Sequence, residues 1–196
     1  EAARPLSLWF SELAPGGDGI GFIEKSNRHS LMFVKRLRPV LLVTFDNLSN
    51  VADKSSERVP WAYKFALDNN VSHLGVLAHG KQWYRDPQLI TRMQQLADAG
   101  FFNGYERVVF AGSSMGAFAA LVFASLVPGA HVLAFNPQTT LDPELVPWED
   151  RYWIGRRQDW TLPLSDARGI LDKCGPVSVF YDPYFAPDHK HFQRLT

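Results

Sequence analysis

Five consecutive residues, Gly112-Ser113-Ser114-Met115-Gly116, have the spacing G-x-S-x-G, which can place a serine nucleophile on a sharp turn. Residues 108–111 (VVFA) are apolar and β-branched, which predicts a buried strand before the turn. Residues 117–126 are rich in alanine and leucine, which predicts a helix after it. A strand that turns into a helix so quickly strains its central residue, and side chains two places on either side would collide. The two glycines fit this requirement, and the hydroxyl of Ser114 is expected to project from the end of the strand.

The chemistry expected of this turn is acyl transfer. The helix that follows would direct its free N–H groups and positive dipole end toward the serine, where an oxyanion develops when a hydroxyl attacks a carbonyl. The alternative interpretation is a turn of small residues that contains a serine by chance. The predicted strand before the motif and the predicted helix after it favour the nucleophile.

Composition limits the other functions that the chain could have. Its 196 residues are enough for one domain with a sizeable core, and 20 basic side chains balance 20 acidic ones, so nothing indicates a nucleic-acid partner. Cys174 is the single cysteine, which excludes a disulfide framework and fits a reducing, cytoplasmic compartment. No apolar run approaches the roughly 18 residues of a membrane helix. The chain begins at Glu1 rather than at a methionine, so the lack of a signal-peptide pattern says little about targeting.

Apolar runs alternate with helical patterns along most of the chain. Strands are predicted at residues 6–12, 19–25, 30–35, 39–45, 72–79, 108–111, 130–135 and 177–181. Helices are predicted at residues 61–69, 88–99 and 117–126, with another that begins near residue 188. This alternation predicts an α/β protein whose mostly parallel sheet is covered by helices on both faces. The first three strands could form a meander at one edge.

Ligands bind to such sheets at the carboxyl ends of the strands. Several polar side chains fall just past predicted strand ends: Ser114, Asp46, Asn47, His79, Asn136 and Asp182. They are therefore expected to gather on one rim of the sheet.

From about residue 39 onward, the chain resembles an α/β-hydrolase. The resemblance rests on the G-x-S-x-G turn, the order of strands and helices around it, and an aspartate directly after a later strand. It implies that Ser114 is the nucleophile and that Asp182 is the acid that orients a histidine. It also implies that the N–H of Met115 is one oxyanion donor and that the N–H of Asn47, in the loop that begins at Asp46, is the second. No metal or organic cofactor is implied.

The histidine departs from the family pattern. The family places it after one more strand, whereas this chain stops at Thr196. One explanation is that the sequence is a shortened version of a longer protein, so that the sheet lacks its last strand. The other is that the base is His189 or His191, which both follow Asp182. Without a base, Ser114 would be poorly activated.

A long segment without clear periodicity follows the strand at 130–135. Residues 138–165 occupy the place where α/β-hydrolases often insert a lid or cap. Trp148 and Trp153 in this segment could line a pocket for an acyl chain or a sugar ring, or they could pack the edge of the sheet. The run Asp188-His189-Lys190-His191 is interpreted as the polar start of a helix capped by Asp188 rather than as a metal site, because alternating histidines diverge on a helix.

These observations predict a serine hydrolase that cleaves a carboxylic ester, as a carboxylesterase or a deacetylase of a sugar or metabolite. Its substrate would be a small molecule or a glycan ester. An acyltransferase that forms the same acyl-Ser114 intermediate is an alternative. A non-catalytic α/β-hydrolase-like module of a larger protein is another, and the oligomeric state is open.

Overall fold

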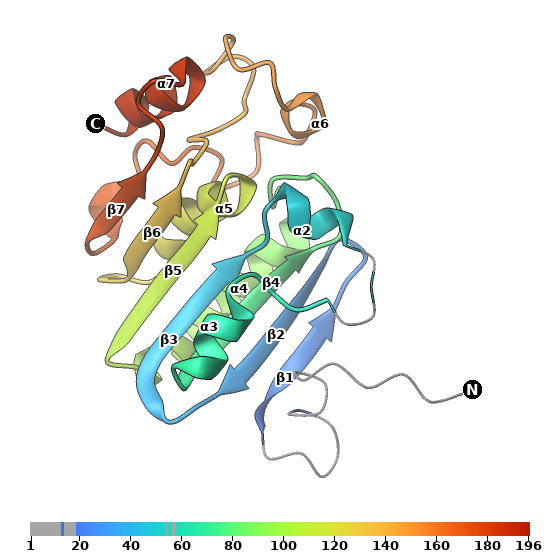
Figure 1. Cartoon of the computed structure of the whole chain (residues 1–196), viewed down its shortest axis with the longest axis vertical. Helices are drawn as coiled ribbons and strands as arrows, with labels where there is room; N and C mark the ends of the chain where they lie inside the picture. Colours follow the sequence, from blue (N-terminus) through green and yellow to red (C-terminus); the bar gives the residue numbers. More distant parts are fainter. Residues whose placement is uncertain (1–12, 14–18, 54, 56–57) are drawn as a thin grey trace.

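The computed structural model describes residues 13, 19–53, 55 and 58–196. Its strands form one seven-stranded sheet in the order β1-β2-β4-β3-β5-β6-β7 (Figure 1). Two strands at one edge pair in antiparallel fashion with their neighbours, and the others are parallel. The strands are β1 (Ile20–Lys25), β2 (His29–Lys35), β3 (Arg38–Phe45), β4 (Val71–Ala78), β5 (Arg107–Ser113), β6 (His131–Phe135) and β7 (Val177–Phe180).

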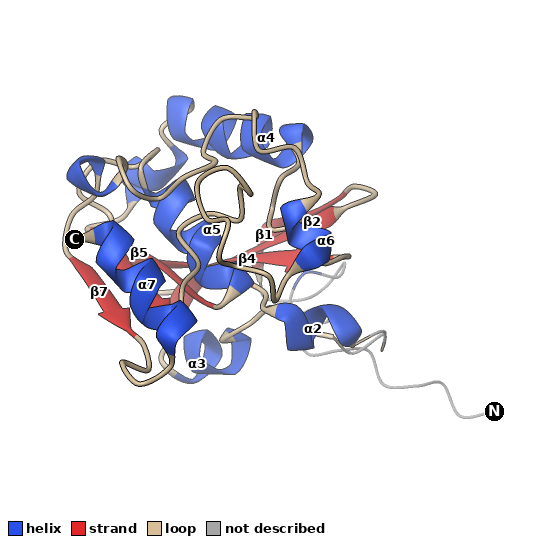
Figure 2. Ribbon diagram, turned by 90° about the horizontal axis from the view of Figure 1, so that it is seen from above, coloured by secondary structure: helices blue, strands red, loops and turns tan. Residues whose placement is uncertain are grey.

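Helices cover both faces of this sheet. Figure 2 shows α4 and α5 on one face and α3 on the other, so the predicted α/β class is confirmed. Among the helices that the structure describes, none has the length and apolar character needed to cross a membrane. The helices are α2 (Leu48–Ala52), α3 (Tyr63–Asp68), α4 (Pro87–Asp98), α5 (Met115–Ala124), α6 (Trp153–Arg156) and α7 (Ala186–Leu195), with 3-10 turns η1 (Phe101–Gly104) and η2 (Leu171–Lys173).

The central helix α5 has no polar face. Every one of its residues is buried, which explains its uniformly small and apolar sequence. Its side chains meet the sheet on one side, and on another side Phe118 contacts Trp160, with 5.5 Å between the ring centroids. A helix in this position can tolerate a strained residue at its N-cap because packing holds the helix itself in place.

The strand predicted at residues 6–12 lies outside the described residues. Two other details differ from the sequence-based expectations. Residues after β3 form the short helix α2 rather than a loop, because the Asn47 side chain accepts the N–H groups of Ser49 and Asn50. Asp188 is not the cap of α7, because the helix begins at Ala186 and the carboxylate of Asp188 pairs with Arg151 at 3.0 Å.

Residues 137–166, here called the rim segment, lie beyond the carboxyl ends of β5 and β6 (Figure 1). Its one helix is α6. The buried guanidinium of Arg85 anchors it by donating to the carbonyls of Leu162, Pro163 and Leu164 at 2.6, 3.0 and 2.7 Å. The cation thereby satisfies three carbonyls of an irregular segment, which would otherwise lose their hydrogen bonds when buried.

Helix α7 is held against the rim segment by a buried polar network. His191 Nε2 donates to Glu149 Oε2 at 3.1 Å, and its Nδ1 accepts the N–H of Thr139 at 3.1 Å. The second bond requires Nδ1 to be unprotonated, so His191 is neutral. Burial lowers the pKa of His191, and the bond to Glu149 only partly offsets this effect. Burial alone would raise the pKa of Glu149, but hydrogen bonds from His191 and Arg151 lower it to about 2.

We expect the His191 network to make stability depend on pH. In the unfolded chain His191 has its ordinary pKa, whereas the folded value is lower, so the free energy of unfolding should fall as pH drops below about 6.5. One such group changes it by at most about 1.4 kcal/mol per pH unit. Urea unfolding measured between pH 7.5 and pH 5 should show the free energy of unfolding falling more steeply as the pH drops for the wild-type protein than for His191→Gln.

The matched control is His189→Gln on the same helix, which should keep the wild-type slope. Burial lowers the pKa of His73 to about 3 and so produces the same trend, but equally in all three proteins. Equal slopes for wild type and His191→Gln would contradict this prediction.

Candidate active site

Ser114 has the strained backbone that the sequence predicts for the central residue of the turn. Its φ is 52° and its ψ is −118°, at the position that caps α5. For a residue other than glycine, this conformation costs about 1–3 kcal/mol. Its N–H donates to the carbonyl of Phe135 at 2.8 Å, and its own carbonyl accepts the N–H groups of Ala117 and Phe118. Strand β6 and helix α5 therefore hold the bend from both sides.

The two glycines are required because backbone segments touch each other here. A Cβ on Gly112 would lie 2.8 Å from the nitrogen of Ala117 and even closer to the backbone of Gly116. A Cβ on Gly116 would lie 2.9 Å from the carbonyl oxygen of Asp46 and closer still to that of Phe45. The bend thus places β3, β5 and the start of α5 in direct backbone contact.

The hydroxyl of Ser114 donates to Gln138 Oε1 at 3.4 Å. Gln138 is 1% exposed, and its Nε2 donates to the carbonyl of Asn136 at 3.2 Å. An amide oxygen cannot remove the serine proton, so Gln138 can orient the hydroxyl but cannot activate it. Gln138 is not among the site residues predicted from the sequence, although it stands directly beyond Asn136-Pro137 at the end of β6.

The predicted oxyanion donors lie on two different elements. Met115 is the first residue of α5, where an N–H has no partner within the helix. The N–H of Asn47 donates to Asn50 Oδ1 at 3.2 Å, so that bond must open before Asn47 can serve an oxyanion. Asp46 is fully buried and ion-paired with Arg58. Burial raises the pKa of Asp46, and its carboxylate also accepts the N–H groups of Trp61 and Ala78.

The predicted acid and bases have other hydrogen-bond partners in this structure. Asp182 is exposed after β7, and its Oδ1 accepts the N–H of Tyr184 at 2.9 Å. His189 lies beside Tyr181, with 3.5 Å between Nδ1 and the hydroxyl oxygen, and His191 is committed to Glu149. Among the described residues, no hydrogen bond joins Ser114 or Asp182 to either histidine.

The predicted aromatic lining is divided between two surroundings. Trp148 is half-buried against α7, with its ring centroid 4.7 Å from that of His191 and 5.2 Å from Lys190 Nζ. Trp153 is 62% exposed on α6, beneath the guanidinium of Arg157. Trp148 therefore packs a helix onto the rim segment, and Trp153 faces solvent.

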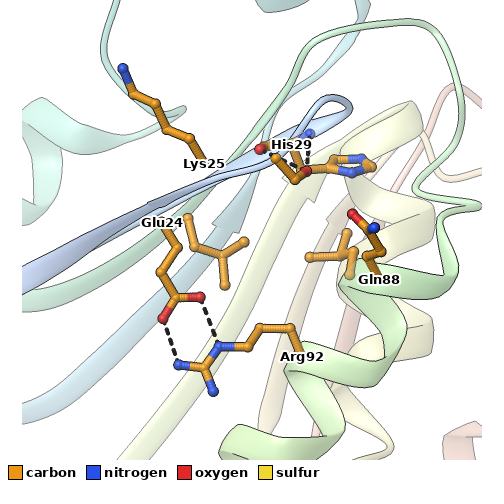
Figure 3. A pocket seen from close by; sticks show the side chains of 8 residues that line it. Glu24, Lys25, His29, Gln88 and Arg92 are labelled. Atoms are coloured by element: carbon orange, nitrogen blue, oxygen red, sulfur yellow. Dashed lines mark hydrogen bonds and ion pairs between the residues drawn. The ribbon is translucent and has the colours of Figure 1, made fainter.

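A separate cavity of about 170 Å³ lies between the β1–β2 hairpin and α4. Figure 3 shows the bidentate Glu24–Arg92 ion pair on one side and His29 and Gln88 on the other. Strands β4 and β3 stand between β2 and β5, so this cavity is not part of the Ser114 site. In the ranges 19–53 and 58–196, no cluster of three His, Cys, Asp or Glu side chains could hold a metal ion.

We expect Gly116→Ala to destabilise the protein by about 1–3 kcal/mol, because the new methyl group meets the rigid carbonyls of β3. The matched control is Gly104→Ala, since nothing lies within 4 Å of a Cβ at that position. Urea unfolding measures both effects: a change in the midpoint concentration, with the dependence of the unfolding free energy on urea unchanged, reports a change in stability. Equal midpoints for the two variants would show that β3 does not press against the bend.

The sequence matches no protein-family model and no curated protein. Solved structures are similar to it in fold. The capsule O-acetyltransferase of Neisseria meningitidis serogroup A has a TM-score of 0.60 and 15% identity, over 88% of this chain and 78% of that one. Carboxyl esterase 2 from Tuber melanosporum has a TM-score of 0.56 and 15% identity, over 93% and 73% of the two chains. A bacterial heroin esterase has a TM-score of 0.52 and 14% identity, over 90% and 70%. The chain therefore shares the α/β fold of these enzymes.

Proposed function

We propose that this protein is a serine enzyme that processes carboxylic esters through an acyl-Ser114 intermediate. The observation that carries the proposal is the φ of 52° at Ser114, at the amino terminus of the buried helix α5. Such strain persists only where surrounding structure enforces it, and it is concentrated at functional sites. The shared fold with carboxylesterases and an O-acetyltransferase supports the same chemistry.

In the proposed reaction, the oxygen of Ser114 attacks the acyl carbon of the ester. The carbonyl π electrons move to oxygen, and the Met115 N–H stabilises the resulting oxyanion. The C–O bond to the alcohol then breaks, and the alcohol leaves with the proton that Ser114 gave up. Water repeats the sequence on the acyl-enzyme and releases the carboxylic acid.

A histidine is the proposed carrier of that proton, and two sources are open. His189 or His191 could serve after α7 rearranges, which for His191 means giving up the bonds to Glu149 and Thr139. The other source is a histidine in a chain that continues beyond Thr196. Asp182 is the proposed partner of the histidine in either case.

A fluorophosphonate probe tests the proposal directly, because it labels only an activated serine. We expect the full-length protein to be labelled, and labelling to disappear in Ser114→Ala. The matched control is Ser113→Ala, the neighbouring half-buried serine, which should still be labelled. A folded wild-type protein that the probe does not label would contradict the proposed enzymatic function and favour a non-catalytic module.

An O-acyltransferase is the second candidate, favoured by the TM-score of 0.60 to a capsule O-acetyltransferase that has also been solved with CoA. The two reactions differ in what discharges the acyl-enzyme. For a hydrolase, a simple sugar added to acetylated protein should leave the rate of deacetylation unchanged. Faster deacetylation with an acetylated sugar as product would show the transferase.

A further inference from the structure

Two consecutive aromatic residues in the loop between β4 and α4 reach both sides of the candidate site. On the nucleophile side, Trp83 Nε1 donates to Gln138 Oε1 at 3.3 Å. The same oxygen accepts the hydroxyl of Ser114 at 3.4 Å. The indole therefore fixes the acceptor that orients the nucleophile. Trp83 is itself confined by the rim segment, because a Cβ on Gly155 would lie 2.5 Å from its ring.

On the other side, the hydroxyl of Tyr84 donates to the carbonyl of Asp46 at 2.8 Å. That carbonyl belongs to the peptide bond whose N–H is that of Asn47, the expected second oxyanion donor. Burial raises the pKa of Tyr84 well above its ordinary value, so the phenol keeps its proton and remains a donor. Its ring also packs edge-on against Phe45, with centroids 5.2 Å apart.

The backbone conformation of Trp83 and Tyr84 is energetically unfavourable for residues other than glycine. The carbonyl of Gln82 accepts the N–H of Arg85 at 3.0 Å, which closes a four-residue turn around the two aromatics. The central residues have φ values of 48° at Trp83 and 56° at Tyr84, the sign pattern of a type I′ turn. Glycine, asparagine and aspartate dominate such positions, yet both residues here are bulky and 1% exposed. Packing and hydrogen bonds must hold them in place.

We propose that the Trp83–Tyr84 turn is a positioning element that sets the distance between the Ser114 hydroxyl and the Asp46–Asn47 peptide before α2. The inference rests on the proposed function of Ser114. One strained turn connects the nucleophile, through Gln138, to the segment from which the second oxyanion donor comes. The indole N–H of Trp83 and the hydroxyl of Tyr84 are both buried, so they do not touch the substrate. They act on the reacting groups through Gln138 and the Asp46 peptide. Their loss should lower kcat more than it changes KM.

The test uses Trp83→Phe and Tyr84→Phe in the full-length protein, because each removes one donor and keeps an aromatic ring. We expect kcat for a p-nitrophenyl ester to fall about tenfold in each variant, with KM changed by less than about twofold. The matched control is Tyr105→Phe, which loses a phenol hydroxyl at the opposite end of β5 and should keep the wild-type kcat. Rates are normalised to the folded fraction from thermal unfolding.

Folded variants with the wild-type kcat would overturn the inference. So would a loss of rate that merely follows the loss of folded protein. If Trp83→Phe does not fold, Tyr84→Phe, which lacks a single oxygen, decides the question alone. The proposed function fails in a different way: the wild-type protein then shows no acylation of Ser114, and the variants have nothing to alter.

Discussion

The contact between the backbone of β3 and the start of α5 is the constraint on which the rest of the site depends. At Gly116 the helix comes so close to the carbonyls of Phe45 and Asp46 that no side chain fits between them. This contact fixes where α5 begins. Because β5 ends at Ser113, Ser114 alone must turn the chain from the strand into the helix. The positive φ of Ser114 is the consequence, and complete burial of α5 stabilises the strained arrangement.

Around this bend, buried polar groups as well as apolar packing hold the layer beyond the strands. The rim segment has little regular structure, so its buried polar groups need partners from elsewhere. Arg85 supplies them for the carbonyls of residues 162–164, and His191 of α7 supplies them for Thr139 and Glu149. A buried polar group that loses its hydrogen-bond partner typically costs about 1–3 kcal/mol, so these contacts contribute to the stability of the fold.

Much of the fold could be predicted from the sequence, because strands and helices here follow from local patterns. The strands at 39–45, 72–79 and 130–135 are mostly apolar runs, and the bend at Ser114 follows from two glycines and steric exclusion. Helix α2 could also have been predicted, since Asn47 and Asn50 have the spacing of a reciprocal cap. These residues were instead predicted to form a loop.

The polar contacts could not be predicted, because they join residues far apart in the chain. Thr139 and His191 are 52 residues apart, and Trp83 and Gln138 are 55 apart. Sequence order suggested His191 as a base, but it could not show that His191 is buried with Thr139 and Glu149 as its partners. The strained backbone at Trp83 and Tyr84 could not be predicted from the sequence, since aromatic residues are not expected at positive φ.

Trapping the acyl-enzyme would show directly whether Ser114 is the nucleophile. The full-length protein would be incubated briefly with p-nitrophenyl acetate, quenched in acid, digested and analysed by mass spectrometry. We expect one acetyl group, on the oxygen of Ser114. Acetyl groups found only on Ser113 or on surface lysines would contradict it, because the strained bend would then present no nucleophile.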